Sequence, residues 1–276
     1  MDSWLLSTPL GLAFVLLIVF MTILWAVAYR LHRLDLVDAG WGGGFVVIAL
    51  TAFLWLPTAG TTSEPYIGLT PRVISSLLVL VWALRLTIHI LQRMLRHKSE
   101  DIRYKNLRKK WRGSVAIHSY VQVFLLQAVL IYVICLPLMI ISLVDPPTDG
   151  WLLVGSIVWL IGFLFETIGD WQLARFSRDP KHKNAVLTTG LWRYTRHPNY
   201  FGEVTQWWGI FLIGVSLLLF SPFYVLLILP SPLLITFLIL KVSGVPLTEK
   251  LMSKHDGWEE YVGETSKFLP LPPKKE

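Results

Sequence analysis

Long apolar runs separated by short polar breaks occupy most of this 276-residue chain. A helix needs about 20 mostly apolar residues to cross about 30 Å of hydrocarbon. Seven runs approach or exceed that length, at residues 5–28, 42–56, 73–95, 115–144, 151–176, 200–220 and 223–242. The pattern therefore predicts an all-α fold, a polytopic membrane helical bundle with about seven transmembrane helices.

Composition supports a membrane protein and excludes several other classes. Hydrophobic residues make up 54% of the chain and charged residues only 16%, with a mean hydropathy of +0.57. A soluble domain carries roughly a quarter charged residues, so a soluble globular domain, a disordered chain and a disulfide scaffold are excluded. The single cysteine, Cys135, lies in an apolar run and is expected to be packed there. The first apolar stretch is interpreted as a span rather than a signal peptide, because no basic residue precedes it.

Basic residues are distributed unevenly between the two sides of the predicted bundle. All but two of the 25 Lys and Arg residues fall on alternate connections and on the C-terminal tail, the exceptions being Arg72 and Arg85. By the positive-inside rule these connections are cytoplasmic, so we expect the N-terminus outside and the C-terminus in the cytoplasm. The net charge of +7 then reflects topology, and no nucleic-acid partner is expected.

Several polar residues interrupt the apolar spans at helical spacing. They are Arg85 and His89 in the third run, Glu166 and Asp170 in the fifth, and Asn199, Glu203 and Gln206 at the start of the sixth. Within each set the spacing of three or four residues puts the side chains on one helix face. Ionisable groups at membrane depth cost about 2.5–3.5 kcal/mol on insertion scales and usually mark a site. Together with Asp38 they are expected to converge on the cytoplasmic third of the bundle; a purely structural polar network is the alternative.

The segment from Gly190 to Glu203 is the richest in candidate chemistry. It combines cationic, titratable and aromatic residues with a helix start that carries Pro198 in its first turn. Free backbone N–H groups at such a start favour anions, and Arg193 and Arg196 could bind phosphate. The alternative is a juxtamembrane anchor for lipid headgroups.

At these residues the sequence resembles the bacterial membrane family labelled steroid 5-alpha-reductase-like, whose function is unknown. The resemblance is carried by residues 165–176, 190–203 and 242–249 and extends from the Asp38 turn to the Phe268-Leu269-Pro270 segment. Its superfamily includes NADPH-dependent steroid and sterol reductases, and isoprenylcysteine carboxyl methyltransferases that use S-adenosylmethionine. The resemblance implies one membrane domain, 1–276, with substrate-side helices in 1–144 and cofactor-binding helices in 145–276. It also implies a multi-pass protein of a bacterial inner membrane.

Carried over residue by residue, the resemblance implies two groups of site residues. The Asn, Gly and Glu of the reductase cofactor segment match Asn199, Gly202 and Glu203, and the Asp of the preceding helix matches Asp170. The Gln-Glu pair and the tyrosine of the substrate half have no match, and Asp38 and His89 occupy comparable places as candidate catalytic residues. The candidate cofactor-binding residues are Glu166, Asp170, Arg175, Arg193, Tyr194, Arg196, His197, Asn199, Tyr200, Glu203 and Trp207.

Two activities fit these residues. The first is NADPH-dependent reduction of a carbon–carbon double bond conjugated to a carbonyl, in a steroid-like or isoprenoid enone that enters from the membrane lipids. Its proton donor would be His89 or a protonated Asp38, and a rim of Arg103, Arg108, Lys109, Arg193 and Arg196 would neutralise the cofactor phosphates. The alternative is transfer of a methyl group from S-adenosylmethionine to a lipid or prenylated acceptor. A non-enzymatic carrier ranks last because the outer halves of the spans are apolar, and no metal site is expected because no two histidines are four residues apart.

Overall fold

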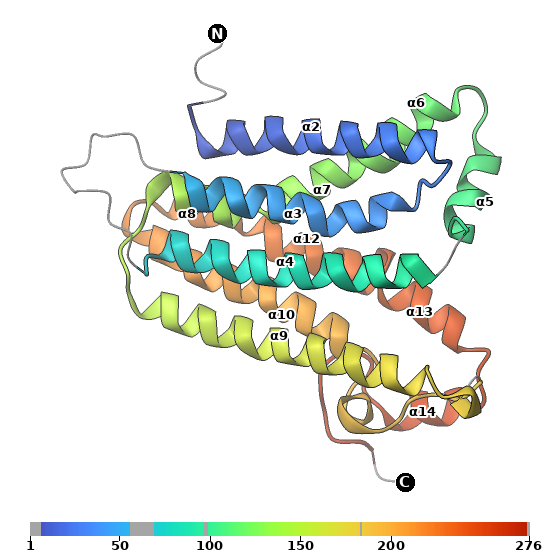
Figure 1. The fold of residues 1–276 in the computed structure, drawn as a ribbon. Helices are drawn as coiled ribbons and strands as arrows, with labels where there is room; N and C mark the ends of the chain where they lie inside the picture. The colour runs from blue at the N-terminus through green and yellow to red at the C-terminus, as the bar shows by residue number, and fades with distance from the viewer. Residues whose placement is uncertain (1–6, 56–68, 97–98, 183, 275–276) are drawn as a thin grey trace. The chain divides into compact units, whose positions relative to one another are not determined.

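The computed structural model describes residues 7–55, 69–96, 99–182 and 184–274 (Figure 1), and in these ranges the chain is helical apart from loops and one isolated bridge between Ala185 and Asp256. Seven helical stretches are long and apolar enough to cross a membrane: Pro9–Arg30, Leu36–Leu54, Pro71–Gln92, Val115–Ile134, Gly150–Phe176, Pro198–Leu219 and Pro222–Met252. The predicted all-α, polytopic membrane fold is confirmed. The expected span ends at residues 5 and 56 lie outside the described residues.

The chain divides into two compact units. The first contains residues 1–149 and 214–230, and the second contains residues 150–213 and 231–276. The segment 214–230 thus belongs to the first unit, and the division of roles between 1–144 and 145–276 stays a prediction.

In the first unit, three long helices lie side by side with α3 (Leu36–Leu54) between α2 (Pro9–Arg30) and α4 (Pro71–Arg96). The glycine-rich start of the second predicted span has a packing role. A Cβ at Gly42 would lie 3.1 Å from the Thr87 backbone nitrogen and 3.2 Å from the Ala83 carbonyl oxygen. The absent side chain therefore lets α3 approach the backbone of α4 closely.

The remaining elements of the first unit are shorter. They are α5 (Ile102–Lys110), α6 (Val115–Ser119), the π-helix η1 (Tyr120–Leu125), α7 (Leu126–Ile134), α8 (Leu136–Val144), the 3₁₀ helix η4 (Gly214–Leu219) and α11 (Pro222–Ile228). The apolar run 115–144 was expected as one span, but the helix breaks at Cys135. Pro137 explains the break, because proline has no N–H to donate and its ring opposes helix continuation.

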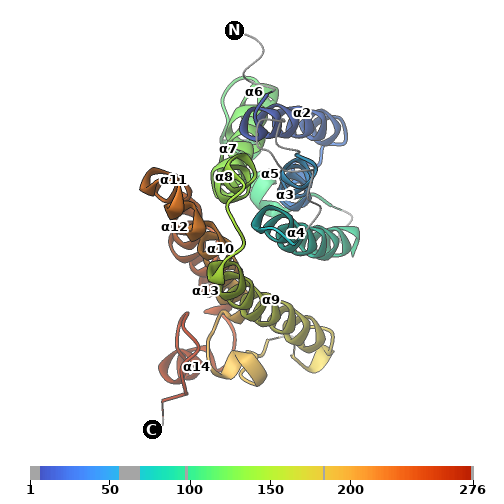
Figure 2. The ribbon, with the colours of Figure 1, turned by 90° about the vertical axis from the view of Figure 1, so that its left-hand side faces the viewer.

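The second unit is built on one helix pair. It consists of α9 (Gly150–Phe176) packed against α10 (Pro198–Ile213), with η2 (Pro180–His182), η3 (Gly190–Arg193), α12 (Pro230–Phe237), η5 (Leu238–Val242), α13 (Val245–Met252) and α14 (Trp258–Glu264). Figure 2 shows the same elements from a second direction.

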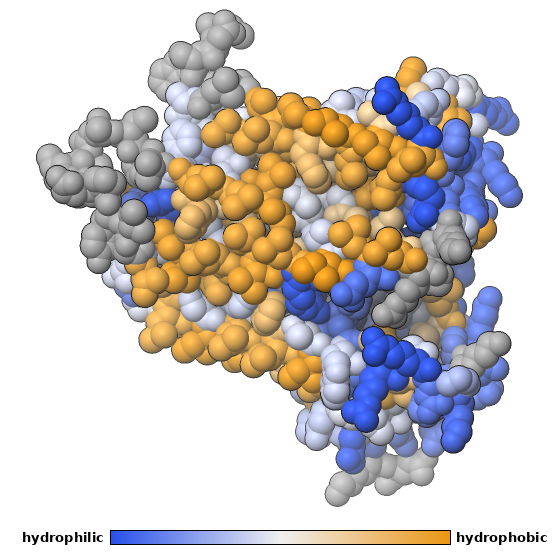
Figure 3. All heavy atoms as spheres, in the orientation of Figure 1, coloured by the Kyte–Doolittle hydropathy of each residue, from blue (hydrophilic) through white to orange (hydrophobic). Residues whose placement is uncertain are grey.

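Surface hydropathy matches a membrane environment in the first unit. Figure 3 shows an apolar face over α2, α3 and α4, and hydrophilic side chains gathered near the ends of these helices where α5 lies. On α2 and α4, the exposed aliphatic residues include Val19, Ile23 and Val81. Such continuous apolar exposure suits lipid contact rather than water.

Candidate functional site

Glycines set the geometry of the α9–α10 pair. Gly155, Gly162 and Gly169 recur every seven residues on α9 and face Gly209, Gly202 and the start of α10 at Pro198 and Asn199, respectively. A Cβ at Gly162 would lie 2.6 Å from the Gly202 carbonyl oxygen, and one at Gly209 would lie 2.6 Å from the Trp159 nitrogen. Small residues at these positions let two membrane helices touch backbone to backbone.

This close packing brings two carboxylates of α9 to two amides of α10. The Gln206 side-chain amide donates a hydrogen bond of 2.6 Å to Glu166, which is 3% exposed. The Asn199 amide donates one of 3.1 Å to Asp170, one helical turn further along. The structure thus brings together four of the polar residues that the spacing assigned to one face of each helix.

The loop before α10 is held in place by the C-terminal segment. The Tyr261 hydroxyl donates to the Trp192 carbonyl oxygen at 2.6 Å, and the Arg196 nitrogen donates to the Ser266 carbonyl oxygen at 2.9 Å. On the other side, the Trp192 indole donates to the Gly169 carbonyl oxygen of α9 at 3.1 Å. The segment that the sequence marked as richest in chemistry is therefore anchored on both sides.

Glu249 of α13 contacts Arg196 and His197 of this loop and Lys267 of the C-terminal segment. One of its oxygens lies 2.8 Å from Arg196 and 3.5 Å from His197, and the other lies 3.4 Å from Lys267. Burial lowers the pKa of His197 to about 4, and the nearby Arg196 and Lys267 act in the same direction while Glu249 opposes them. His197 is therefore neutral near pH 7, and its Nδ1 is buried without a hydrogen-bond partner.

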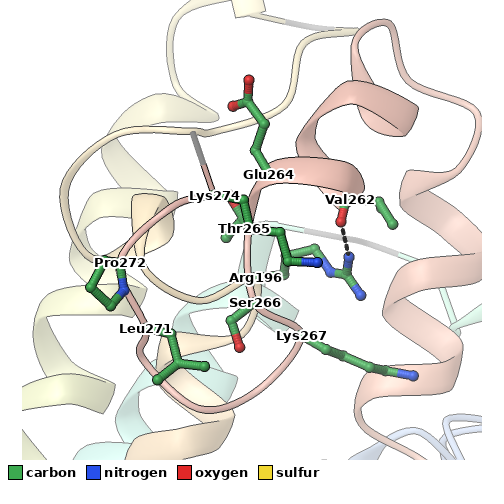
Figure 4. Close-up of a pocket in the computed structure, with 9 residues that line it drawn as sticks. All are labelled: Arg196, Val262, Glu264, Thr265, Ser266, Lys267, Leu271, Pro272 and Lys274. Carbon is green, nitrogen blue, oxygen red and sulfur yellow. Dashed lines mark hydrogen bonds between the residues drawn. The ribbon is translucent and has the colours of Figure 1, made fainter. Parts of the chain in front are cut away.

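Arg196 also lines a cavity of about 480 Å³ (Figure 4). The guanidinium donates to the Val262 carbonyl oxygen at 3.1 Å, and Lys267 and Lys274 line the same cavity. Glu264 is the carboxylate among the lining residues, so cations outnumber it there. Arg196 was expected to be a solvent-facing cation, but it is only 8% exposed because Glu249 and α14 hold it.

The other predicted cofactor residues occupy varied positions in the second unit. The Tyr200 hydroxyl pairs with Thr248 of α13 at 3.0 Å, Glu203 is half-buried, and Trp207 is buried in the helix packing. Arg175 lies over the Trp171 ring at 5.7 Å, and Arg175, Arg193 and Tyr194 are exposed.

In the first unit, Asp38 is the centre of a second polar cluster. The Tyr104 hydroxyl donates to one of its oxygens at 2.6 Å, and Arg103 binds the other at 2.7 Å. Burial, together with the Asp38 carboxylate, raises the pKa of Tyr104 well above its ordinary value, so the phenol keeps its proton. Both Asp38 oxygens act as acceptors in these two contacts.

His89, the other candidate catalytic residue, is exposed on α4. The expected rim cations Arg103 and Arg108 have carboxylate partners, Asp38 and Glu100, each at 2.7 Å. The sequence reasoning missed Tyr104, which lies in a basic segment with no apolar periodicity to mark it. It also passed over Glu249, although that residue stands in one of the motifs that carried the resemblance.

Comparison with known proteins decides the family. A family model described as "Protein of unknown function (DUF1295)" matches residues 24–265. The chain belongs to the DUF1295 family. This family is the steroid 5-alpha-reductase-like group, so the expectation from the sequence motifs is confirmed.

Individual relatives of this DUF1295 protein are distant. The bovine (Bos taurus) 3-oxo-5-alpha-steroid 4-dehydrogenase 1 is 35% identical over 74 residues, which cover 25% of the chain and 29% of that enzyme. An uncharacterised protein of Schizosaccharomyces pombe is 22% identical over 243 residues, covering 77% of the chain and 67% of the yeast protein. No solved structure matches significantly.

Proposed function

We propose that this DUF1295 protein is an NADPH-dependent membrane reductase that saturates a carbon–carbon double bond conjugated to a carbonyl in a lipophilic substrate. The observation that carries the proposal is the Tyr104–Asp38–Arg103 cluster, a protonated phenol held by a carboxylate that a cation neutralises. Similarity to a protein named as a steroid 4-dehydrogenase supports the same reaction class.

The second unit offers a donor set that fits NADPH. Asp170, Asn199 and Glu203 on α9 and α10 are suited to the hydroxyl and amide groups of the ribose and nicotinamide. Arg196, Lys267 and Lys274 around the 480 Å³ cavity are suited to its phosphates. The buried Gln206 carbonyl oxygen is also without a hydrogen-bond partner. When bound, NADPH supplies a hydride to carbon.

Taken by itself, the first unit offers a hydroxyl group suited to a substrate carbonyl oxygen. Tyr104, turned from Asp38 toward a substrate carbonyl, donates a hydrogen bond that stabilises the negative charge forming on that oxygen. Arg103 stays on Asp38 and keeps the carboxylate paired while Tyr104 is engaged. A proton taken from water and delivered to the adjacent carbon completes the addition of two hydrogen atoms.

Cofactor binding tests the proposal most directly. We expect NADPH to raise the melting temperature of the detergent-purified protein, and both Asn199→Ala and Glu203→Ala to lose that shift while the unliganded proteins remain folded. Thr205→Ala, on the same helix, is the matched control, because its hydroxyl bonds only within α10, to Phe201. Stabilisation by S-adenosylmethionine alone would replace the reductase with a methyltransferase. A full NADPH shift in both variants would reject the assigned cofactor residues.

Turnover tests the reaction itself. Loss of NADPH absorbance with a steroid-like or isoprenoid enone, and a product heavier by two hydrogen atoms, is the expected result. An NADPH-binding protein that reduces none of a panel of such enones would contradict this reaction class.

A further inference from the structure

The helix α5 has a position that the proposed reaction does not explain. It lies in the connection between the candidate spans Pro71–Gln92 and Val115–Ile134, so it stays on one side of the membrane. In Figure 1 it runs across the ends of α2, α3 and α4 rather than along them. A short helix in this place lies in the headgroup layer, along the plane of the bilayer.

The inner face of α5 is fixed to the first unit. Tyr104 is buried against a core cluster that includes Leu34, Val37 and Phe124, and Leu107 and Trp111 pack on the same cluster. At the end of the helix, the Trp111 indole donates to Gln122 at 2.9 Å and its ring stacks on His118. These contacts therefore fix the orientation of α5, so that its opposite face points away from the first unit.

The outward face carries cations without counter-charges. Lys109 and Lys110 are exposed, Lys105 is half-buried, and Arg112 follows directly and is exposed. Within the described part of the chain, these four side chains form no ion pair, in contrast to Arg103 and Arg108, which pair with Asp38 and Glu100. Ile102, 64% exposed, lies on the same outward side at 100° per residue.

The unpaired cations and the exposed isoleucine indicate a partner that offers both anionic and apolar groups. An anionic bilayer surface offers phosphates to lysines and arginines and an apolar boundary to an aliphatic side chain. A soluble nucleotide offers phosphates but gives Ile102 no comparable environment. We propose that Lys105, Lys109, Lys110 and Arg112 form a docking surface for the phosphate groups of anionic membrane lipids.

The experiment measures lipid selectivity of the full-length protein in bilayers. Spin-labelled phosphatidylglycerol and phosphatidylcholine compete for the protein surface in phosphatidylcholine vesicles at low salt. Since one cation near an anionic surface contributes about 1 kcal/mol, we expect a phosphatidylglycerol preference of at least about fivefold. The K105Q/K109Q/K110Q/R112Q protein should lose most of this preference, and high salt should weaken it in the wild type.

Two further variants make the result specific. R178Q/K181Q/K250Q/K254Q removes the same charge from exposed positions of the second unit and should keep the preference. K105R/K109R/K110R retains the charge and should keep it too. Equal losses in the α5 and control variants would show an effect of net charge alone and overturn the proposal. Displacement of the labelled lipid by NADPH would overturn it as well, because the surface would then belong to the nucleotide. The melting temperature of each variant verifies that it is folded.

Discussion

The two polar clusters of this molecule satisfy their carboxylates in different ways. Asp38 stands at the start of its helix and is bound by an arginine and a tyrosine from a surface helix, 65 and 66 residues later in the chain. Glu166 and Asp170 lie well inside α9 and are bound by side-chain amides of the helix packed against it. The bonds to Asp38 include one from a cation near the surface, whereas the amide bonds to Glu166 and Asp170 come from neutral donors in the helix interface.

This difference predicts how each cluster responds to change. The amide–carboxylate pairs depend on the glycine contacts that bring α9 and α10 together, so disturbing those contacts disturbs the fold. In the Asp38 cluster, Tyr104→Phe keeps the buried ring that packs on the core and removes only the hydroxyl that bonds to Asp38. We therefore expect stability phenotypes from the glycine contacts of the α9–α10 pair and activity phenotypes from the Asp38 cluster.

The largest effect is expected from Gly162→Leu. Even a Cβ at this position would lie 2.6 Å from the Gly202 carbonyl oxygen and 2.7 Å from the Gln206 nitrogen, both backbone atoms. The helices must separate, which removes the bonds from Gln206 and Asn199 as well, and the cost should reach about 3 kcal/mol or more. Fluorescence-detected size exclusion of the detergent extract should show little folded protein.

Gly150→Ala is the matched control for this prediction. It changes a glycine at the start of the same helix where no atom lies within 4 Å of the added Cβ. A Gly162→Leu protein as stable as this control would show that backbone contact does not hold the pair together.

The next effect concerns chemistry rather than folding. Tyr104→Phe removes the proposed donor and should lower turnover about 100-fold, while NADPH still stabilises the protein. Tyr132→Phe, which also deletes one tyrosine hydrogen bond in the first unit, should keep its activity.

His89→Phe separates the two candidate donors. If His89→Phe loses turnover and Tyr104→Phe does not, His89 is the donor to the substrate carbonyl. The Asp38 cluster would then have no role in the reaction.

The contrast also explains what could be predicted from the sequence. The seven spans follow from apolar length alone, and the α9–α10 polar pairs follow from spacing, because both signals are local to one helix. The seven-residue separation predicts that Gln206 and Asn199 lie on one face of their helix. In the structure, this face contacts the carboxylates of the preceding long helix.

The Asp38 cluster could not be found in this way. Tyr104 reaches Asp38 through a surface segment whose helix begins at a capping aspartate, Asp101, and whose residues show no membrane pattern. The burial of Arg196 was missed for a related reason, because its partner Glu249 belongs to another helix, 53 positions along the chain. Orientation in the membrane remains a prediction, and reporter fusions at the two termini would test it.

A pH-dependent loss of stability should come from the second unit. The folded state holds the pKa of His197 near 4, against an ordinary value of 6.5. Between pH 6.5 and 4, His197 is protonated in the unfolded chain but stays neutral in the folded chain. The free energy of unfolding therefore falls as pH drops toward 4, and His197 does not affect it above pH 7. At pH 5 the contribution is about 2 kcal/mol.

Melting temperatures across this pH range measure the effect. His197→Phe should flatten the profile between pH 4 and 6.5, whereas His32→Asn, at an exposed histidine of the first unit, should leave it unchanged. Identical profiles for wild type and His197→Phe would mean that another group is responsible.

The smallest effect on stability is expected from a substitution of Arg175 in the second unit. Its guanidinium lies 5.7 Å from the Trp171 ring centroid on an exposed turn of α9. An exposed cation–π contact contributes only about 0.5–1 kcal/mol, so Arg175→Gln should lower the melting temperature slightly. If Arg175 binds the cofactor, the same variant should also weaken NADPH affinity, and Trp171→Leu, which removes the ring but keeps the cation, should not. Equal losses of NADPH affinity in both variants would assign the effect to the geometry of this turn rather than to the charge of Arg175.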